Sequence, residues 1–336
     1  MNDTQRAVLD AMGGDPASGP EIAERLGVTR AAVWKAVEGL REAGFEIDSD
    51  EGGYALVDLP EYGADVVEHR VDGAFTIEHH GSIRSTNARA RKLARNGRFG
   101  REDASGLVVL ADEQTGGRGR LDRRWVSPAG GVWMSVLIRP DLPPARAPLL
   151  TLAAAVATAR AVDGDVTGPD ADTDSTMSVG LKWPNDVLTI DGAGRERKLA
   201  GILTEMDGET DEVSWVVVGI GVNANVDAAG LPDGATSLRE LCGDVDRGRL
   251  VGSILPEFDR LRSSPERILS AWRDRSLTLG RRVRVETGEE TAVGDAVGVD
   301  PPGTLLVDTG DETVRIHAGD CEHLRPAKAD RPQERT

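Results

Sequence analysis

Residues that build redox or metal sites are scarce in this sequence. Of its 336 residues only Cys242 and Cys321 are cysteines, which excludes a disulfide framework and gives no metal-site spacing. The five histidines include one close pair, His79-His80, and adjacent residues on a strand face opposite ways, so this pair is a poor chelate. The chain has no continuous apolar run of about 18 residues and no signal peptide. We therefore expect a cytoplasmic protein without a membrane segment.

Positive charge and aromatic residues are also in short supply. The chain has 40 basic and 57 acidic residues, and its formal net charge is −17. A surface with this excess repels phosphate, which argues against bulk nucleic-acid binding. Aromatic residues make up 4% of the chain, whereas Asp, Glu, Gly and Ala are plentiful. This composition resembles that of cytosolic proteins from salt-accumulating organisms, a hypothesis that salt-dependent folding would support.

One segment departs from the acidic background. Residues 116–125, GGRGRLDRRW, hold four arginines and three glycines between strands expected at 107–111 and 132–139. Glycine lets a backbone come close to a ligand, and the arginine fork suits phosphate and carboxylate. The segment is either a loop that closes over a small anion or a basic loop that contacts nucleic acid, and these residues alone leave both interpretations open.

The first 60 residues predict a winged helix-turn-helix. Helices are expected at 5–12, 21–26 and 30–43, followed by a strand, a Gly-Gly turn and a strand within 44–56. Thr29 is a suitable N-cap for the recognition helix, on which Arg30, Lys35 and Arg41 are expected to be exposed. These cations suffice for phosphate contacts, but the acidic wing opposes them. A three-helix interaction module that does not bind DNA remains the alternative.

The rest of the chain divides by its pattern. Residues 61–75 are expected to be an irregular linker, and residues 76–277 alternate strands with helices. Residues 278–327 contain short strands with Gly and Asp turns, which predicts a small β domain. The acidic segment 164–178 and the tail 328–336 are expected to be surface without a function.

Three motifs in the middle region can carry chemistry. Ser85-Thr86-Asn87 opens a helix, where such residues usually cap but can also bind an anion. Lys182 lies between apolar neighbours in KWPND, where Asn185 and Asp186 either build a turn or assist a bound anion. The third motif, KLAGILTE from Lys198, has a glycine inside a strand, which marks a close approach of another backbone or a ligand.

With GIGVNAN from Gly219 and the arginine loop, these motifs are five in number, and their order and spacing resemble the family of bifunctional biotin–protein ligases and biotin operon repressors. The resemblance covers nearly the whole chain. It implies an α+β protein with an N-terminal winged helix-turn-helix and a C-terminal SH3-like β-barrel. Between them it implies a central mixed β-sheet with helices, as in class II aminoacyl-tRNA synthetases and biotin ligases.

The resemblance also implies a two-step reaction. Biotin and ATP would form biotinyl-5′-AMP, which then acylates a lysine of the biotin carboxyl carrier domain of a carboxylase. Mg²⁺ would arrive with ATP near Asp186, without a tightly bound metal. A biotin-responsive repressor role would use Thr29, Arg30 and Lys35 on operator DNA and a ligand-dependent homodimer. A lipoate-type acyl ligase of the same fold and a regulator that senses biotin without catalysis are the alternatives.

The family's site roles fall on residues of the quoted motifs. Those implied to bind biotin are Ser85, Thr86, Asn87, Gln114, Arg118, Gly119, Arg120, Lys198 and Gly201. Those implied to bind ATP or the adenylate are Arg120, Arg123, Trp125, Lys182, Asn185, Asp186 and Asn223. Arg118, Lys182 and Lys198 are the implied catalytic residues, with Lys182 holding the biotin carboxylate and α-phosphate. Asp122 departs from the family pattern, in which many members carry glycine before the next arginine, and its role is left unexplained.

Overall fold

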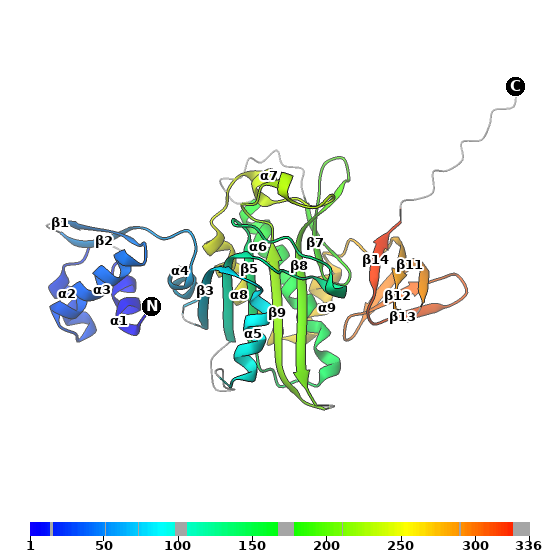
Figure 1. Ribbon diagram of the computed structural model, residues 1–336, viewed down its shortest axis with the longest axis horizontal. Helices are drawn as coiled ribbons and strands as arrows, with labels where there is room; N and C mark the ends of the chain where they lie inside the picture. Colours follow the sequence, from blue (N-terminus) through cyan, green and yellow to red (C-terminus); the bar gives the residue numbers. More distant parts are fainter. Residues whose placement is uncertain are drawn as a thin grey trace, which may run out of the picture.

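The computed structural model describes residues 1–13, 16–50, 52–72, 74–97, 106–166, 178–209, 211–288 and 290–324. The chain folds into three parts in a row, with a small helical unit at one end, a large sheet with helices in the middle and a second, smaller sheet at the other end (Figure 1). This α+β arrangement confirms the predicted fold class. Most of the acidic segment 164–178 and all of the tail 328–336 lie outside the described residues.

The N-terminal unit is the predicted winged helix-turn-helix. The recognition helix α3 buries Val33, Val37 and Leu40 on one face, at the spacing that the sequence predicts. Its N-cap is Thr29, whose hydroxyl oxygen accepts a hydrogen bond from the backbone N–H of Ala32 at 3.1 Å. The elements are α1 Asp3–Ala11, α2 Gly19–Leu26, α3 Arg30–Glu42, β1 Glu46–Asp50 and β2 Gly53–Asp58.

The expected linker contains a helix, α4 Ala64–Arg70, so the prediction of an irregular segment is wrong here. Val66 and Val67 of this helix are buried and join the main hydrophobic core. A helix of only seven residues with one short apolar stripe gives little periodic signal, which is why the sequence pattern does not show it.

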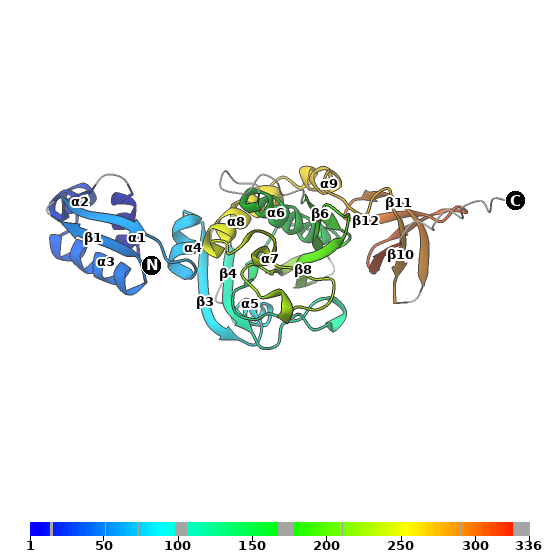
Figure 2. The same cartoon turned by 90° about the horizontal axis from the view of Figure 1, so that it is seen from above.

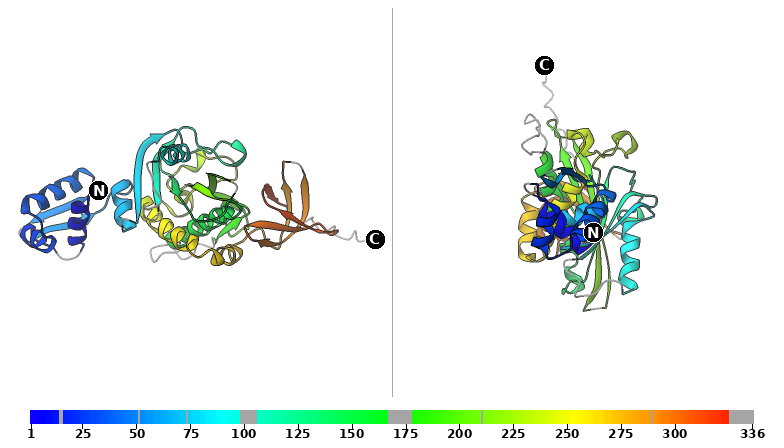
Figure 3. Two further views of the ribbon diagram at one scale, coloured as in Figure 1. Left: turned by 90° about the horizontal axis from the view of Figure 1, so that it is seen from below. Right: turned by 90° about the vertical axis from the view of Figure 1, so that its left-hand side faces the viewer.

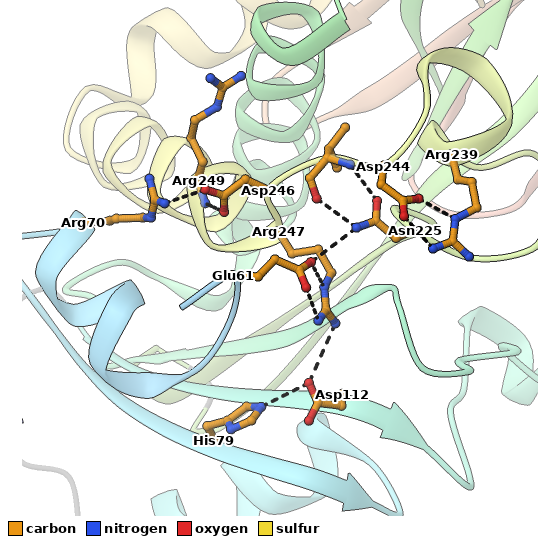
Figure 4. Close-up of polar contacts among 11 residues, drawn as sticks. Glu61, Arg70, His79, Asp112, Asn225, Arg239, Asp244, Asp246, Arg247 and Arg249 are labelled. Carbon is orange, nitrogen blue, oxygen red and sulfur yellow. Dashed lines mark hydrogen bonds and ion pairs between the residues drawn. The ribbon is translucent and has the colours of Figure 1, made fainter. Parts of the chain in front are cut away.

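Polar contacts fix this segment to the start of α8 (Arg247–Arg262), as Figure 4 shows. The Glu61 carboxylate accepts two hydrogen bonds from Arg247, at 2.7 and 3.3 Å, and Arg70 pairs with Asp246 at 2.5 Å. A Cβ on Gly248 would lie 2.6 Å from the Glu61 carbonyl oxygen, so glycine is needed there for the two segments to touch. The segment that contains Glu61 and α4 is therefore packed against the start of α8.

The central domain is built on a seven-stranded sheet in the order β3-β4-β5-β9-β8-β7-β6, in which only β3 and β4 run parallel. Along a strand such as β4, successive side chains are buried on opposite faces of the sheet. Val108 and Leu110 of β4 join the core under the large helices, whereas Leu107 and Val109 pack toward α5. The strands are β3 Phe75–Ile83, β4 Gly106–Gln114, β5 Val132–Ile138, β6 Ser178–Lys182, β7 Asp186–Ile190, β8 Glu196–Gly208 and β9 Val213–Val222.

Helices cover the two faces unequally. One face packs against α6 Pro148–Val166, behind which lie α8 and α9 Pro265–Arg273, and the other carries α5 Thr86–Arg95 (Figures 2 and 3). A short helix, α7 Leu238–Cys242, follows β9. The stretch Pro144–Gly164 is long and apolar enough to cross a membrane by length and composition alone, but 72% of its most apolar window is buried in the protein. It therefore behaves as the core helix that the Ala- and Leu-rich sequence predicts.

The C-terminal part is one antiparallel sheet in the order β13-β12-β11-β10-β14. It joins the central domain beside the β6–β7 turn, where the Trp183 indole N–H donates to the Gly303 carbonyl at 2.9 Å. This contact brings the small sheet to the KWPND motif. The strands are β10 Arg282–Glu286, β11 Thr291–Asp300, β12 Thr304–Asp308, β13 Thr313–Ile316 and β14 Asp320–His323.

Candidate functional site

A cavity of about 840 Å³ lies on the α5 face of the central sheet. The start of α5, the arginine loop after β4, and strands β8 and β9 contribute its walls, and Gly319 and Asp320 of the C-terminal part close one side. A cavity of this size suits a small ligand with an attached nucleotide.

The cavity gathers predicted residues that are up to 138 positions apart in the chain, from Ser85 to Asn223. All of these residues line the same cavity. They are Ser85, Thr86, Asn87, Gln114, Arg118, Gly119, Arg120, Arg123, Trp125, Asn185, Asp186, Lys198, Gly201 and Asn223.

Lys182 is the exception, because it is not among the described residues that line the cavity. In the β6–β7 hairpin its backbone lies opposite that of Asp186. Its charge also helps to lower the pKa of Asp320, on which Arg123 has the larger effect. The lysine inside the cavity is Lys198, whose ammonium lies 2.6 Å from the Asp186 carboxylate. The implied contact of Lys182 with the ligand therefore stays a prediction, and Lys198 is the lysine that lines the cavity among the described residues.

The arginine loop is held at its base by backbone hydrogen bonds. Gly116 N–H donates to the Arg84 carbonyl at 2.8 Å, and Gly119 N–H donates to the Arg123 carbonyl at 2.8 Å. At its tip, Leu121 and Asp122 adopt positive φ angles of 54° and 58°. Such angles are unfavourable for leucine and tolerated by aspartate, so the tip stores some backbone strain.

Three of the four arginines of the loop contact different groups. Arg118 pairs with Asp122 at 2.6 Å, which gives the unexplained aspartate a partner. Arg120 is more buried and donates to Asn185 Oδ1 at 3.3 Å and to the Gly319 carbonyl at 3.1 Å. Arg123 pairs with Asp320 at 2.6 Å, and this contact holds the pKa of Asp320 below its usual range.

Trp125 explains the glycines of β8 and β9. A Cβ on Gly221 would lie 2.7 Å from Trp125 Nε1, and a Cβ on Gly201 would lie 3.3 Å from the same ring. Lys198 places its ammonium 5.1 Å from the ring centroid, a cation–π contact. Gly201 and Gly221 therefore make room for this indole, whereas the sequence pattern indicated a close approach of another backbone or a ligand.

Neutral hydrogen-bonding groups of α5 and β4 line the end of the cavity next to α5, beside the ion pair between Arg91 and Glu205 at 2.6 Å. The Gln114 side-chain oxygen accepts from the Thr86 N–H at 2.9 Å, and its amide donates to Ser127 Oγ at 3.0 Å. Asn87 Nδ2 donates to Glu205 at 2.8 Å and to the Leu203 carbonyl at 3.3 Å. Because its polar atoms are already bonded to protein, Asn87 anchors α5 to the sheet, and the structure gives less support to its implied contact with biotin.

Three buried polar atoms of the lining have no hydrogen-bond partner among the described residues. Asp186 Oδ1 still has the Lys198 ammonium as an ion-pair partner, whereas the acceptor Asn223 Oδ1 and the donor Trp125 Nε1 have none. Leaving such groups unsatisfied costs about 1–3 kcal/mol each. A polar ligand in the cavity would supply the missing partners.

On the N-terminal unit, Arg30 and Lys35 are exposed on α3, as predicted. Arg41 is not available in the same way, because it donates to the Ile47 carbonyl at 2.7 Å and to Ser49 at 2.6 Å. These bonds tie the recognition helix to the wing, so the expectation that Arg41 is an exposed cation is wrong.

Sequence reasoning missed several residues around the cavity. Ser135 is fully buried on β5 and contacts Thr86 and Asn87. It is the only polar residue in the run VWMSVLI, a signal that could have identified it. Asp320 gave no such signal, because it belongs to another domain and meets the arginines only in the folded chain.

Fold and cavity together define a helix-turn-helix protein whose central domain carries one cavity lined by ion-paired cations. Residues 81–223 match the Biotin/lipoate A/B protein ligase family, residues 278–324 the Biotin protein ligase C terminal domain, and residues 11–55 an HTH domain. The chain is 37% identical to the bifunctional ligase/repressor BirA of Bacillus subtilis (strain 168), over 91% of this chain and 93% of the relative.

Two further comparisons agree. The chain is 38% identical to the biotin–[acetyl-CoA-carboxylase] ligase of Mycobacterium tuberculosis, over 72% of this chain and 86% of that protein. The solved biotin protein ligase from Aquifex aeolicus, in complex with biotin and ATP, matches with a TM-score of 0.56 and 26% identity, covering 74% of this chain and 99% of that one. The chain therefore belongs to the biotin protein ligase family, among members with an N-terminal helix-turn-helix domain, and is a ligase enzyme.

Proposed function

We propose that this protein activates biotin with ATP to biotinyl-5′-AMP and transfers the biotinyl group to a lysine of a biotin carboxyl carrier domain. The observation that carries the proposal is a single cavity with uncharged groups at Thr86 and Gln114 and cations at Arg118, Arg120 and Lys198. A substrate with a neutral polar ring and a distant carboxylate fits this division.

The first step joins two anions, the biotin carboxylate and the α-phosphate of ATP. Their repulsion is the main obstacle, and cations fixed in a partly desolvated cavity lower it. Lys198 is held between the Asp186 carboxylate and the Trp125 ring, so its ammonium is positioned before substrate arrives. The carboxylate oxygen of biotin attacks phosphorus and pyrophosphate leaves, so the chemistry needs no nucleophilic side chain from the protein.

In the second step the amine of the acceptor lysine attacks the acyl carbon of the adenylate, and AMP leaves. The adenylate is hydrolysed if water reaches it first. Arg118 lies on the exposed part of the loop, and we assign it to closure over the mixed anhydride. Arg120 holds the loop to Asn185 and Gly319 while this happens.

Magnesium fits the site as a companion of ATP. The described residues contain no cluster of three or more His, Cys, Asp or Glu side chains that could hold a metal. Asp186 is one of several carboxylates in the lining, and without a metal-binding cluster it suits an ion bound mostly by phosphate oxygens and water. When bound, the ion would neutralise phosphate charge, and Asp186 would be its protein contact.

We also propose operator binding through α3, with Thr29 capping the helix and Arg30 and Lys35 contacting phosphates, in a homodimer that forms when ligand is bound. The exposure of both cations supports this role. The use of ATP and the absence of a disulfide between Cys242 and Cys321 support a cytoplasmic location.

The decisive experiment incubates the full chain with biotin, MgATP and a purified carrier domain, and detects the biotinylated product by mass spectrometry. Parallel reactions with lipoate separate the two acyl ligase classes. We expect the carrier domain to be modified in the reaction with biotin and to stay unmodified in the reaction with lipoate. Modification by lipoate, or biotin binding without pyrophosphate release, would overturn the proposal.

A further inference from the structure

Ser135 lies beneath the end of the cavity next to α5, where it contacts Thr86 and Asn87. It is fully buried on β5, and its strand neighbour across the sheet is Gly219. A Cβ on Gly219 would lie 2.2 Å from Asn87 Oδ1, so the absence of a side chain there lets Asn87 reach Ser135. A hydroxyl in such a position is expensive to bury and is expected to have a defined bonding task.

Its neighbours determine where its proton points. Ser135 Oγ lies 2.5 Å from Asn87 Oδ1 and 2.7 Å from Thr86 Oγ1. Asn87 must direct its amide nitrogen toward Leu203 and Glu205, because both of those atoms only accept, so its oxygen faces Ser135. That oxygen cannot donate, and the single proton of Ser135 therefore goes to Asn87.

The direction of the Thr86 proton follows. With its own proton committed, Ser135 can only accept from Thr86. The other acceptor near Thr86 Oγ1 is Gln114 Oε1 at 3.1 Å, which already receives the Thr86 N–H at 2.9 Å. In either case the hydroxyl proton of Thr86 stays within the protein. What Thr86 can offer to the cavity is a lone pair.

The position of this lone pair matters for the proposed substrate, on which the inference rests. In the proposed function the biotin carboxylate belongs with Lys198 and the loop arginines, so its ring lies at the end next to Thr86 and Gln114. A cyclic urea carries N–H donors, and an oxygen that can only accept recognises one of them. The dithiolane ring of lipoate has no N–H group and leaves the same oxygen unsatisfied.

We propose that Ser135 is a positioning residue that fixes Thr86 as a hydrogen-bond acceptor and thereby selects a ureido ring over a ring without N–H donors. It acts through Thr86 and Asn87 and does not touch the ligand. Without Ser135, the acceptor left to the Thr86 hydroxyl among the contacts described here is Gln114 Oε1, 3.1 Å away and already bonded to the Thr86 N–H. This weaker restraint lets the hydroxyl turn its proton toward the cavity, where it opposes an N–H group.

The test compares Ser135→Ala, Thr86→Val and the double variant in the full chain by calorimetric titration with biotin and desthiobiotin, which shares the urea. Ser135→Ala is expected to weaken both ligands on the order of 10-fold, the loss expected when a buried polar pairing is broken. In the Thr86→Val background the same substitution should change affinity less than about twofold, because its route to the ligand is gone. The KM for ATP should stay unchanged.

Thr158→Val is the matched control, because Thr158 is equally buried on α6 but bonds only to its own helix, at Ala154 O, 2.8 Å away. It should bind biotin as the wild type does. If Ser135→Ala does not fold, Ser135→Cys, with a weaker donor of similar size, should give a smaller loss of the same kind.

Wild-type affinity in Ser135→Ala, or an equal loss with and without the Thr86 hydroxyl, would overturn the inference and leave the ligase function standing. A parallel loss of ATP affinity would also overturn it, because it would indicate general damage. Absence of biotin binding in the wild-type chain would overturn the proposed function itself and the inference with it.

Discussion

Replacing Asp122 by Asn tests whether the loop tip restrains the arginine that closes over the ligand. Asp122 Oδ1 lies 2.6 Å from Arg118 Nη1, and the two side chains are 75% and 55% exposed. Asn is close in size and also tolerates the positive φ of 58° at this position. The substitution therefore removes a charge while the backbone of the loop keeps its conformation.

The size of the effect follows from exposure. Exposed ion pairs contribute about 0.2–1 kcal/mol, so release of Arg118 corresponds to about a 1.4- to 5-fold gain in its availability. Loss of a carboxylate next to an anionic ligand acts in the same direction. We expect biotinyl-5′-AMP to dissociate about 1.5 to 5 times more slowly from Asp122→Asn than from the wild type.

The assay forms the adenylate from biotin and labelled ATP, removes free nucleotide and follows release of labelled product. The difference between variant and wild type should shrink in about 1 M salt, where the screening length is about 3 Å. It should vanish in an Arg118→Gln background. Unchanged or faster release at low salt, or a gain that persists without Arg118, would refute the assignment of Asp122 as a restraint.

Three further predictions follow from the contacts. Lys198→Ala should lower the rate of adenylate formation on the order of 100-fold, whereas Lys182→Ala should lower it less than about tenfold; equal losses in pyrophosphate release would contradict the larger role that we give to Lys198. Burial lowers the pKa of His323 from its ordinary value of 6.5, against the opposing effect of Glu196. The unfolded chain therefore binds the proton first, and stability should fall as pH drops below about 6.5. Thermal unfolding should show this slope in the wild type, and a slope that is unchanged in His323→Gln would contradict it. Arg30→Ala with Lys35→Ala should weaken operator binding in gel shifts and reduce its salt dependence by about two phosphate contacts, with carrier biotinylation unaffected; wild-type operator affinity would exclude this surface.

The sequence predicted most of the fold because local signals agreed with tertiary packing. Thr29 caps α3, the Gly-Gly turn joins β1 to β2, and the apolar runs become β4, β5 and β9. The helix α4 was missed because its stability comes from contacts with α8 that lie far away in the chain. A local sequence pattern shows the intrinsic preference of a segment, whereas the helical conformation of α4 depends on the elements that it packs against.

The candidate site shows the same limit in a different form. Motifs found Arg118, Lys198 and Gly201, because residue type and spacing carry chemical meaning. The motifs also imply a role for Lys182. However, they do not say which face of the β6–β7 hairpin its side chain lies on, because that depends on the neighbouring elements. Ser135 belongs to no motif. Its signal is a polar residue in an apolar strand, from which a buried hydrogen-bond partner could have been inferred.

The different partners of the loop arginines give the loop an internal order. Arg120 is held inside by Asn185 and Gly319, and Arg123 is held by Asp320 of β14, so both tie the loop to fixed parts of the protein. Arg118 is restrained only by Asp122 within the loop itself. Closure can therefore proceed by exchanging the Asp122 carboxylate for the ligand phosphate at Arg118 while the other two contacts persist. A loop of this kind needs no wholesale refolding, and the C-terminal sheet acts as its fixed support.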